Sequence, residues 1–434
     1  MLVRPREGVL YWLQRRLAPR RPRAEGVAFL PPVRILHLAD IHLGTELYGK
    51  LDAATGLSTR VGDFLAALDQ AVDDALARQV DVFLFCGDAY RTRDPNPTYQ
   101  REFALRVRRL ASAGVQVFLL VGNHDLPLAT GRASSIEIFA ALEVPNVHVA
   151  RRPGLHLLQT ANGPLQIAAL PWVLRSTLLL KEEYKNKTLE EINQATVEKI
   201  EHIVRDLATR VDPTVPAVLA AHASVMGAVY GSEQSVILGQ DIPLPKSLLA
   251  DPAYDYVALG HVHKHQVLGT KPLMVYTGSI ERLDFGEENE PKGYVVAEVA
   301  RGDTEFAFCE REARRFLTVD VTAQGEDPMA EVLAAIERAE VAETIVRLRV
   351  RTTEEKEPLI LDGEIRRVLR EAHHVAGVAK IVDRRSRARW AGRALQEMLP
   401  KDALAAYLRQ KDVPPERAKL LQEYGEAIIR ERPV

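Results

Sequence analysis

The feature that most constrains this chain is an alternation of short apolar runs with segments of helical periodicity. Three largely apolar runs, Arg34–Ala39, Val82–Cys86 and Val115–Val121, are typical of strands buried on both faces of a sheet. Apolar residues between the first two runs recur at helical spacing, and Thr98–Ala111 is expected to form the next helix. The order strand, helix, strand, helix, strand predicts an α/β layered fold.

The alternation of expected strands and helices continues through the middle of the chain. A long helix is expected near Thr188–Arg210, where Thr188 and Glu191 fit a capping box. Three further apolar runs are expected to be strands: Ala217–Ala221, Tyr256–Leu259 and Leu273–Thr277. The connection of roughly twenty residues after Asp40 is longer than most loops that only join two elements, so we expect it to have a functional role.

The pattern of expected strands and helices changes after about residue 312. We therefore expect a main domain over 31–311 and a small α+β module over 312–383. The expected elements of the module are the strands Phe316–Val321, Thr344–Val350 and Val378–Val382 and the helices Pro328–Ala339 and Leu361–Ala372. An Arg-rich linker is predicted at 384–394 and a helix pair at 395–434. The linker is interpreted equally well as a solvated tether or as a DNA contact.

Composition narrows the class of protein. The formal net charge is −2, so any attraction to phosphate must be local rather than a property of the whole molecule. Two cysteines cannot form a disulfide framework, which favours a reducing cytoplasmic compartment, and no apolar stretch is long enough to predict a membrane span. The arginine-rich residues 1–30 are interpreted as an extension or an upstream start, with a basic arm for nucleic acid as the alternative.

Polar motifs follow five of the apolar runs, each at the carboxyl end of a predicted strand. They are Asp40-Ile41-His42, Gly87-Asp88, Gly122-Asn123-His124-Asp125, His222 and Gly260-His261-Val262-His263. Ligands of open α/β sheets bind at the carboxyl ends of the strands, so we expect these side chains to meet. Carboxylate oxygens and imidazole nitrogens are ligands for Mn²⁺, Fe²⁺ or Zn²⁺, and the lack of cysteines argues against a structural zinc site.

A single one of these residues is weak evidence for a metal site, whereas the five motifs together are strong evidence. Taken alone, Asp88 is commonly a turn residue and His222 a hydrogen-bonded structural histidine, but five such motifs on strand ends together predict a metal site. His37 is expected to be a packed core residue, and Cys86 a small core residue rather than a nucleophile. For His265 a surface role is favoured over a place in the site.

The order of these motifs resembles the calcineurin-like metallophosphoesterase superfamily over about residues 34–277. The resemblance implies a four-layer α-β-β-α sandwich and two divalent ions, usually Mn²⁺, that share Asp88. It assigns the first ion to Asp40, His42, Asp88 and His263. It assigns the second ion to Asp88, Asn123, His222 and His261. His124 would be the catalytic histidine, with Asp125 orienting it. Two cations about 4 Å apart suit an in-line displacement at phosphorus.

A second stretch narrows the resemblance. The run from Tyr276 to Glu287 resembles the SbcD-type repair nucleases, and the module at 312–383 is similar to their capping domain. The helix pair resembles the segment that grips the coiled-coil base of an SbcC-like ABC ATPase. This implies a homodimeric nuclease for DNA repair and recombination, an exonuclease on duplex ends and an endonuclease on single strands or hairpins.

One departure and two alternatives remain open at this level. Relatives commonly carry His or Asp where this chain has Arg91, which leaves the balance of exonuclease and endonuclease activity undecided. The first alternative is a phosphodiesterase for nucleotides or other small esters, because the same dinuclear site serves both substrates. The second is a non-catalytic architectural protein, which would be expected to lack a ligand or His124; none is missing.

Overall fold

The computed structural model describes residues 31–127, 132–174, 187–231, 241–383, 400–411 and 413–431. The extension predicted at 1–30 and the Arg-rich linker predicted at 384–394 lie outside these residues, as do the first residues of the predicted helix pair.

The first sheet has six strands in the order β12-β11-β1-β2-β3-β4. Its four parallel strands are β1 (Val33–Leu38), β2 (Val82–Phe85), β3 (Gln116–Leu120) and β4 (Val147–Ala150). The antiparallel strands β11 (Lys292–Ala300) and β12 (Asp303–Arg311) extend the sheet beyond β1. Parallel pairing places the carboxyl ends of β1, β2 and β3 at one edge of the sheet.

The second sheet also has six strands, in the order β5-β6-β7-β8-β10-β9. Its parallel centre consists of β6 (Gly163–Leu170), β7 (Ala217–His222), β8 (Tyr256–Gly260) and β10 (Leu273–Tyr276). The strands β5 (Gly154–Thr160) and β9 (Gln266–Thr270) pair antiparallel at the two edges.

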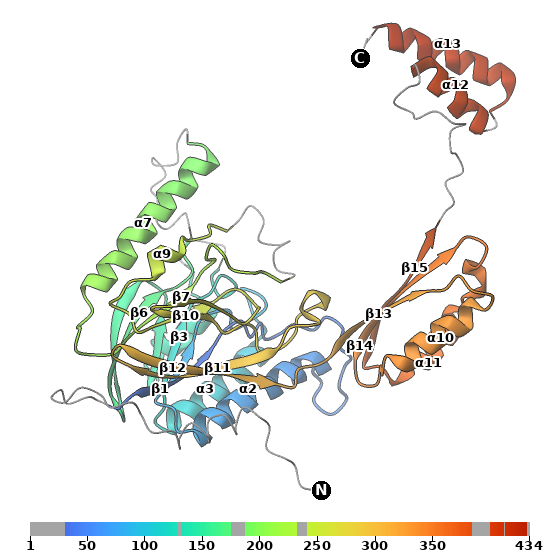
Figure 1. Cartoon of the computed structure of the whole chain (residues 1–434). Helices are drawn as coiled ribbons and strands as arrows, with labels where there is room; N and C mark the ends of the chain where they lie inside the picture. Colours follow the sequence, from blue (N-terminus) through green and yellow to red (C-terminus); the bar gives the residue numbers. More distant parts are fainter. Residues whose placement is uncertain are drawn as a thin grey trace.

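The two sheets pack face to face, and helices cover their outer faces. In β1, Ile35 faces the second sheet, whereas Leu36 faces α2 (Thr59–Ala77) and α3 (Pro97–Ser112). The outer face of the second sheet is covered by α7 (Leu189–Thr209) and α9 (Lys246–Leu249), as Figure 1 shows. The four-layer α-β-β-α sandwich predicted from the sequence is confirmed. The central strands are almost entirely apolar because both of their faces are buried.

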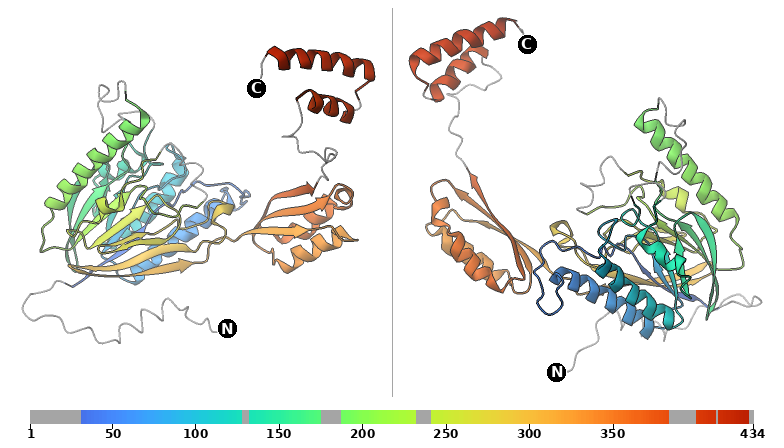
Figure 2. Two further views of the ribbon diagram at one scale, coloured as in Figure 1. Left: turned by 45° about the horizontal axis from the view of Figure 1, so that its top comes forward. Right: turned by 180° about the vertical axis from the view of Figure 1, so that it is seen from behind.

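The segment after residue 312 forms a three-stranded parallel sheet with helices on one face. Its strands β13 (Phe316–Thr322), β14 (Ile345–Thr353) and β15 (His374–Asp383) lie in sequence order. The helices α10 (Pro328–Arg338) and α11 (Asp362–Val368) share its apolar core. Figure 2 shows this module beside the two large sheets, with β13 entering from the end of β12. The five predicted elements are all present.

Two helices end the described chain: α12 (Pro400–Gln410) and α13 (Pro415–Glu431). Figure 1 shows them side by side. The exposed side chains of α13 include Leu420, Leu421, Tyr424 and Ile428. Among the described residues, no helix combines the length and the apolar character that crossing a bilayer requires.

The sequence located the strands β1, β2, β3, β7, β8 and β10 and the helices α3 and α7 to within one residue. The capping box of Thr188 and Glu191 is present at the start of α7. Sequence analysis did not predict β4, β5, β6, β9, β11 or β12, and these strands complete both sheets.

A buried arginine joins the main domain to the module. Arg60, in the first turn of α2, is fully buried and pairs with Asp63 at 2.7 Å. Its guanidinium also lies over the ring of Phe316 in β13, 5.5 Å from the centroid. Asp63 in turn accepts from Arg314 at 2.7 Å. The charge of Arg60 is therefore compensated from the main domain while its flat face contacts the module.

We expect Arg60→Met to lower the free energy of unfolding by about 3 kcal/mol, because it leaves the carboxylates beside it without their buried partner. Chemical denaturation of the full chain measures this loss. The matched control is Arg101→Met, since Arg101 pairs with Glu102 on the surface, where such a pair contributes about 0–1 kcal/mol. Equal losses in the two variants would contradict the structural role of Arg60.

Candidate metal centre

All seven side chains predicted as metal ligands lie at one edge of the paired sheets. The first sheet contributes residues that follow β1, β2 and β3, and the second sheet contributes residues at the ends of β7 and β8. The seven are Asp40, His42, Asp88, Asn123, His222, His261 and His263. Because the two sheets present the carboxyl ends of these strands to each other, residues more than 200 positions apart in the chain come into contact.

The backbone at this edge adopts left-handed conformations at residues other than glycine. The φ angles are +53° at Asp40, +49° at His42, +61° at Asp88 and +100° at His261. Such conformations cost on the order of 1–3 kcal/mol each and persist only where the surroundings fix them. Here they turn each chain away from its strand and aim the side chain into the site.

The glycines before these residues are needed mainly for space. A Cβ on Gly122 would lie 2.2 Å from Oδ1 of Asp88, and one on Gly260 would lie 2.1 Å from the carbonyl oxygen of Cys86. Of the three glycines, only Gly87 has a positive φ, +96°. A Cβ on Gly87 would also lie 2.3 Å from Nδ1 of His222, so all three glycines are required for the close approach of another chain segment, and Gly87 for its backbone conformation as well.

The first group of candidate ligands gathers Asp40, His42 and His263 around one point. The Nε2 atoms of His42 and His263 are 3.1 Å apart, and Nε2 of His42 is 3.7 Å from Oδ2 of Asp88. The carboxylate of Asp40 is fixed by the backbone amide of His261, which donates to it at 2.9 Å. All of these side chains are buried.

The second group gathers Asn123, His222 and His261 on the other side of Asp88. Oδ1 of Asn123 lies 2.9 Å from Nε2 of His222 and 3.1 Å from Nδ1 of His261. Nε2 of His222 is 3.5 Å from Oδ2 of Asp88. The same oxygen of Asp88 therefore faces both groups, which is the geometry a bridging carboxylate requires.

Three of the four candidate imidazoles use their other nitrogen for an outer partner. Nδ1 of His222 lies 2.6 Å from the carbonyl oxygen of Cys86, and Nδ1 of His263 lies 2.8 Å from Oε1 of Glu287. Nε2 of His261 lies 2.6 Å from Oδ2 of Asp241. Metal-bound histidines characteristically bond this way, since the outer acceptor fixes the tautomer and leaves the facing nitrogen unprotonated. The donor set thus fits divalent cations.

Charge in the site is balanced within the protein. Burial by itself would raise the pKa of Asp88, but the imidazole of His222 and its neighbours hold that pKa well below its usual range. Burial likewise opposes protonation of His222, and the carboxylate of Asp88 outweighs it and raises the pKa of His222 to about 9. Asp88 is thus held as an anion at the centre of the cluster.

His124 and Asp125 have different surroundings from those expected. Nδ1 of His124 lies 2.9 Å from the carbonyl oxygen of Arg91, and its ring meets that of His42 edge-on at 4.7 Å. Asp125 instead accepts hydrogen bonds from the backbone amides of Asp88, Ala89 and Gly122 at 2.9–3.0 Å. Asp125 therefore links the two ligand loops, and the bond from His124 goes to the carbonyl of Arg91; the catalytic and orienting roles of His124 and Asp125 stay predictions.

Sequence reasoning missed the outer partners. Asp241 lies in a loop, accepts from Ser224 at 2.5 Å as well as from His261, and carries no periodic signal. Glu287 is fully buried and pairs with the buried Lys292 at 2.9 Å. It stands in the run that resembles SbcD-type nucleases, which is the one signal that could have singled it out.

Three other residues weighed from the sequence lie outside the two ligand groups. The predicted core roles of His37, which is fully buried against Tyr256, and of Cys86 are confirmed. His265, for which the sequence favours a surface role, is partly exposed, and its ring stacks on that of Phe308 with 4.0 Å between the centroids.

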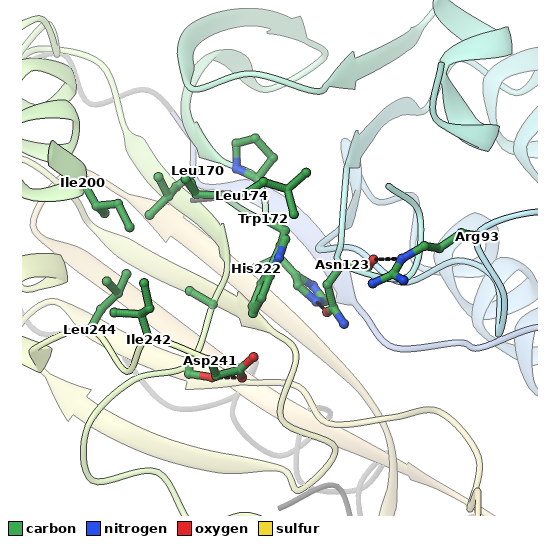
Figure 3. Close-up of a pocket in the computed structure, with 14 residues that line it drawn as sticks. Arg93, Asn123, Leu170, Trp172, Leu174, Ile200, His222, Asp241, Ile242 and Leu244 are labelled. Atoms are coloured by element: carbon green, nitrogen blue, oxygen red, sulfur yellow. Dashed lines mark hydrogen bonds between the residues drawn. The ribbon is translucent and has the colours of Figure 1, made fainter. Parts of the chain in front are cut away.

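A pocket opens beside the second ligand group. We call it the side pocket; it encloses about 430 Å³ and shares Asn123 and His222 with the candidate metal centre. Figure 3 shows Trp172 next to His222, Arg93 on the far side of Asn123, and a cluster of aliphatic side chains at the opposite end. The aliphatic cluster includes Leu170, Ile200, Ile242 and Leu244.

Comparison with known proteins gives a consistent set of relatives. The family model for calcineurin-like phosphoesterases matches residues 33–265. The SbcD component of the SbcCD nuclease of Rhodobacter capsulatus is 30% identical over 70% of this chain and 76% of its own length. The corresponding SbcD protein of Escherichia coli is 25% identical over 63% of this chain, and the alignment spans 66% of that protein. The DNA double-strand break repair protein Mre11 of Methanosarcina acetivorans is 22% identical over 73% of this chain and 45% of its own length.

We expect Asp241→Asn to weaken binding of Mn²⁺ about ten- to a hundredfold, because the amide no longer fixes the tautomer and orientation of His261. Calorimetric titration of the metal-free chain measures the affinity. Asp206→Asn, on the exposed face of α7, is the matched control and is expected to bind Mn²⁺ like the parent chain. An unchanged affinity in Asp241→Asn would show that His261 needs no outer partner.

Proposed function

The chain belongs to the calcineurin-like phosphoesterase family, in its SbcD-type branch, and we propose that it is a metal-dependent DNA nuclease with two ions in its active site. The observation that carries the proposal is the position of Asp88, whose Oδ2 faces one ligand group at 3.7 Å and the other at 3.5 Å. A carboxylate placed between two sets of oxygen and nitrogen donors suits a pair of cations.

In this proposal the two groups described above hold one ion each, with Asp88 shared. Mn²⁺ is the ion we propose, because the resemblance to the calcineurin-like phosphoesterases implies it and the oxygen ligands Asp40, Asp88 and Asn123 suit it. The ions would supply a hydroxide at neutral pH and charge stabilisation at the phosphate. Asn123 is suited to its position because a neutral amide oxygen adds no negative charge beside the substrate phosphate.

His124 is the residue we propose to act on the leaving oxygen. Its bond to the carbonyl of Arg91 places the proton of the neutral ring on Nδ1, so Nε2 carries the lone pair and can gain or release a proton. The backbone amide of His124 donates to Oδ1 of Asp88 at 2.8 Å, which ties the ring to the bridging carboxylate. His124 is therefore fixed relative to the place where the phosphate would bind.

The substrate and partners follow from the relatives. Their names, SbcCD nuclease and double-strand break repair protein, support DNA as the substrate and an SbcC-like ATPase as the partner. We propose exonuclease activity on duplex ends, endonuclease activity on single strands or hairpins, and action as a homodimer in the cytoplasm during repair and recombination. We propose 312–383 as the capping domain and the helix pair as the ATPase-binding segment.

A phosphodiesterase for small esters is the competing function. The test compares release of nucleotides from duplex DNA by the full chain and Mn²⁺ with hydrolysis of bis(4-nitrophenyl) phosphate. Cleavage of DNA is the expected result. Turnover of the small ester without any cleavage of DNA would reject the nuclease and favour the small-ester enzyme.

We expect His124→Asn to lower the rate of DNA cleavage by about 10²–10⁴-fold, the usual contribution of a positioned acid or base. Binding of Mn²⁺ is expected to be largely retained, because His124 belongs to neither proposed ligand group, although it lies within ligand distance of His42 and Asp88. His202→Asn, on the exposed surface of α7, provides the control and should retain full activity. Persistent cleavage by His124→Asn would remove His124 from the mechanism.

The apolar face of α13 generates a prediction about the ATPase. Leu420 and Tyr424 are one helical turn apart, and both are exposed. Replacing both by Asp is expected to abolish co-purification with the SbcC-like ATPase, because charges would enter the apolar contact, while DNA cleavage by the isolated chain persists. Lys419→Asp, an exposed change elsewhere on α13, is the control. Loss of nuclease activity together with binding would indicate that the pair packs on its own domain.

A further inference from the structure

The side pocket adjoins the proposed metal centre so closely that the two share side chains. Asn123 and His222 line the pocket, and both belong to the second ligand group. Any group that enters the pocket therefore lies beside the phosphate on which the proposed centre acts. Its volume of about 430 Å³ falls within the usual range of small-ligand sites, roughly 300–1,000 Å³.

The chemistry of the pocket changes from one end to the other. Arg93, which is exposed, lines one end of the pocket, where its Nε donates to the carbonyl oxygen of Asn123 at 3.4 Å. The opposite end is mainly aliphatic, with Ile200 from α7 and Ile242 and Leu244 from the loop before α9 (Figure 3); Asp241, which also lines the pocket, is occupied by its bonds to His261 and Ser224. A ligand that suits this gradient has a charged end toward the metal centre and an uncharged body that is removed from water.

Trp172 supplies the aromatic surface between these two ends. Its backbone amide donates to the carbonyl oxygen of Val121 at 2.9 Å, which anchors it to the end of β3. Its ring lies 4.9 Å from that of His261 and 6.0 Å from that of His222. The indole is therefore held in place at the border of the metal centre, where it also lines the pocket.

We infer that the side pocket receives the unstacked base of the nucleotide whose phosphate is cleaved, with Trp172 as its stacking surface. This inference rests on the proposed nuclease function. A nucleotide has the required gradient, since it joins an anionic phosphate to a flat, uncharged base. Stacking on aromatic side chains binds bases with little regard to sequence, and the aliphatic wall accepts any of the four.

The inference specifies the substrate more narrowly than DNA in general. A base inside a duplex is stacked and paired, so it enters a side pocket only after it leaves the helix, and this step is unfavourable. Unpaired strands, hairpin loops and frayed ends present such bases already. The pocket thereby favours cleavage next to an unpaired nucleotide.

The test uses the full chain with Mn²⁺ and single-stranded oligonucleotides that carry one tetrahydrofuran abasic residue at a defined position. Rates of cleavage at the two phosphates flanking that residue are compared with rates at the same phosphates in the parent oligonucleotide. We expect the abasic residue to slow one of them about tenfold, the loss expected for one stacked base. Phosphates several nucleotides away serve as internal references.

Two variants test whether the ratio of the cleavage rates of parent and abasic oligonucleotides depends on the pocket. Ile242→Trp fills the aliphatic end of the pocket, and Trp172→Ala removes the stacking surface; in both, parent and abasic substrates are expected to be cleaved at similar rates. Leu157→Trp, an exposed position on β5 outside the pocket, should keep the tenfold ratio. The ratio is informative even where a variant lowers overall activity.

The possible outcomes distinguish failure of the base pocket from failure of the proposed nuclease function. Cleavage of parent and abasic DNA at equal rates by the unaltered chain would overturn the base pocket and leave the nuclease intact; an apolar peptide segment of a protein partner would then be the better occupant. Absence of DNA cleavage alongside hydrolysis of bis(4-nitrophenyl) phosphate would overturn the nuclease, and the base pocket with it.

Discussion

The carboxylate of Asp88 is the point on which the rest of the site depends. It is buried, it stands between two groups of donors, and the imidazole of His222 keeps it ionised by lowering its pKa against the effect of burial. An isolated buried carboxylate would be costly, so the surrounding imidazoles and backbone amides are part of its stability. The position of Asp88 is itself secured by Asp125, which accepts from the amides of Asp88 and Gly122.

The two sheets have to bring their ligand-bearing edges together for this arrangement to exist. Asp40 receives the backbone amide of His261 from the second sheet, and His222 reaches the carbonyl of Cys86 in the first. These contacts are possible because Gly87 and Gly260 leave no side chain in the gap: a Cβ on Gly87 would lie 2.3 Å, and one on Gly260 3.0 Å, from Nδ1 of His222. The same contacts therefore pack the two sheets together and position the side chains of the site.

A short segment connects the site to the module that follows residue 312. Glu287 bonds to His263, and two residues earlier Phe285 packs edge-on against Phe316 at 5.1 Å. Glu288 accepts from the backbone amide of Thr318 at 2.7 Å. The segment thus contacts a proposed ligand on one side and the module on the other, and a buried lysine fixes it through Glu287.

The sequence by itself determined the five strands that carry the ligand motifs and the long helices between them, because periodicity and turn residues are local properties. It also singled out the seven ligand candidates, whose roles remain predictions. Only the tertiary structure decided which groups hold the imidazoles: Asp241 and Glu287 lie outside the strands and long helices, about 20 residues from their histidines, without a periodic signal. It likewise gave Asp125 its backbone role, because the ends of β2 and β3 become neighbours only when their sheet forms, and it formed the side pocket, which residues from both sheets line.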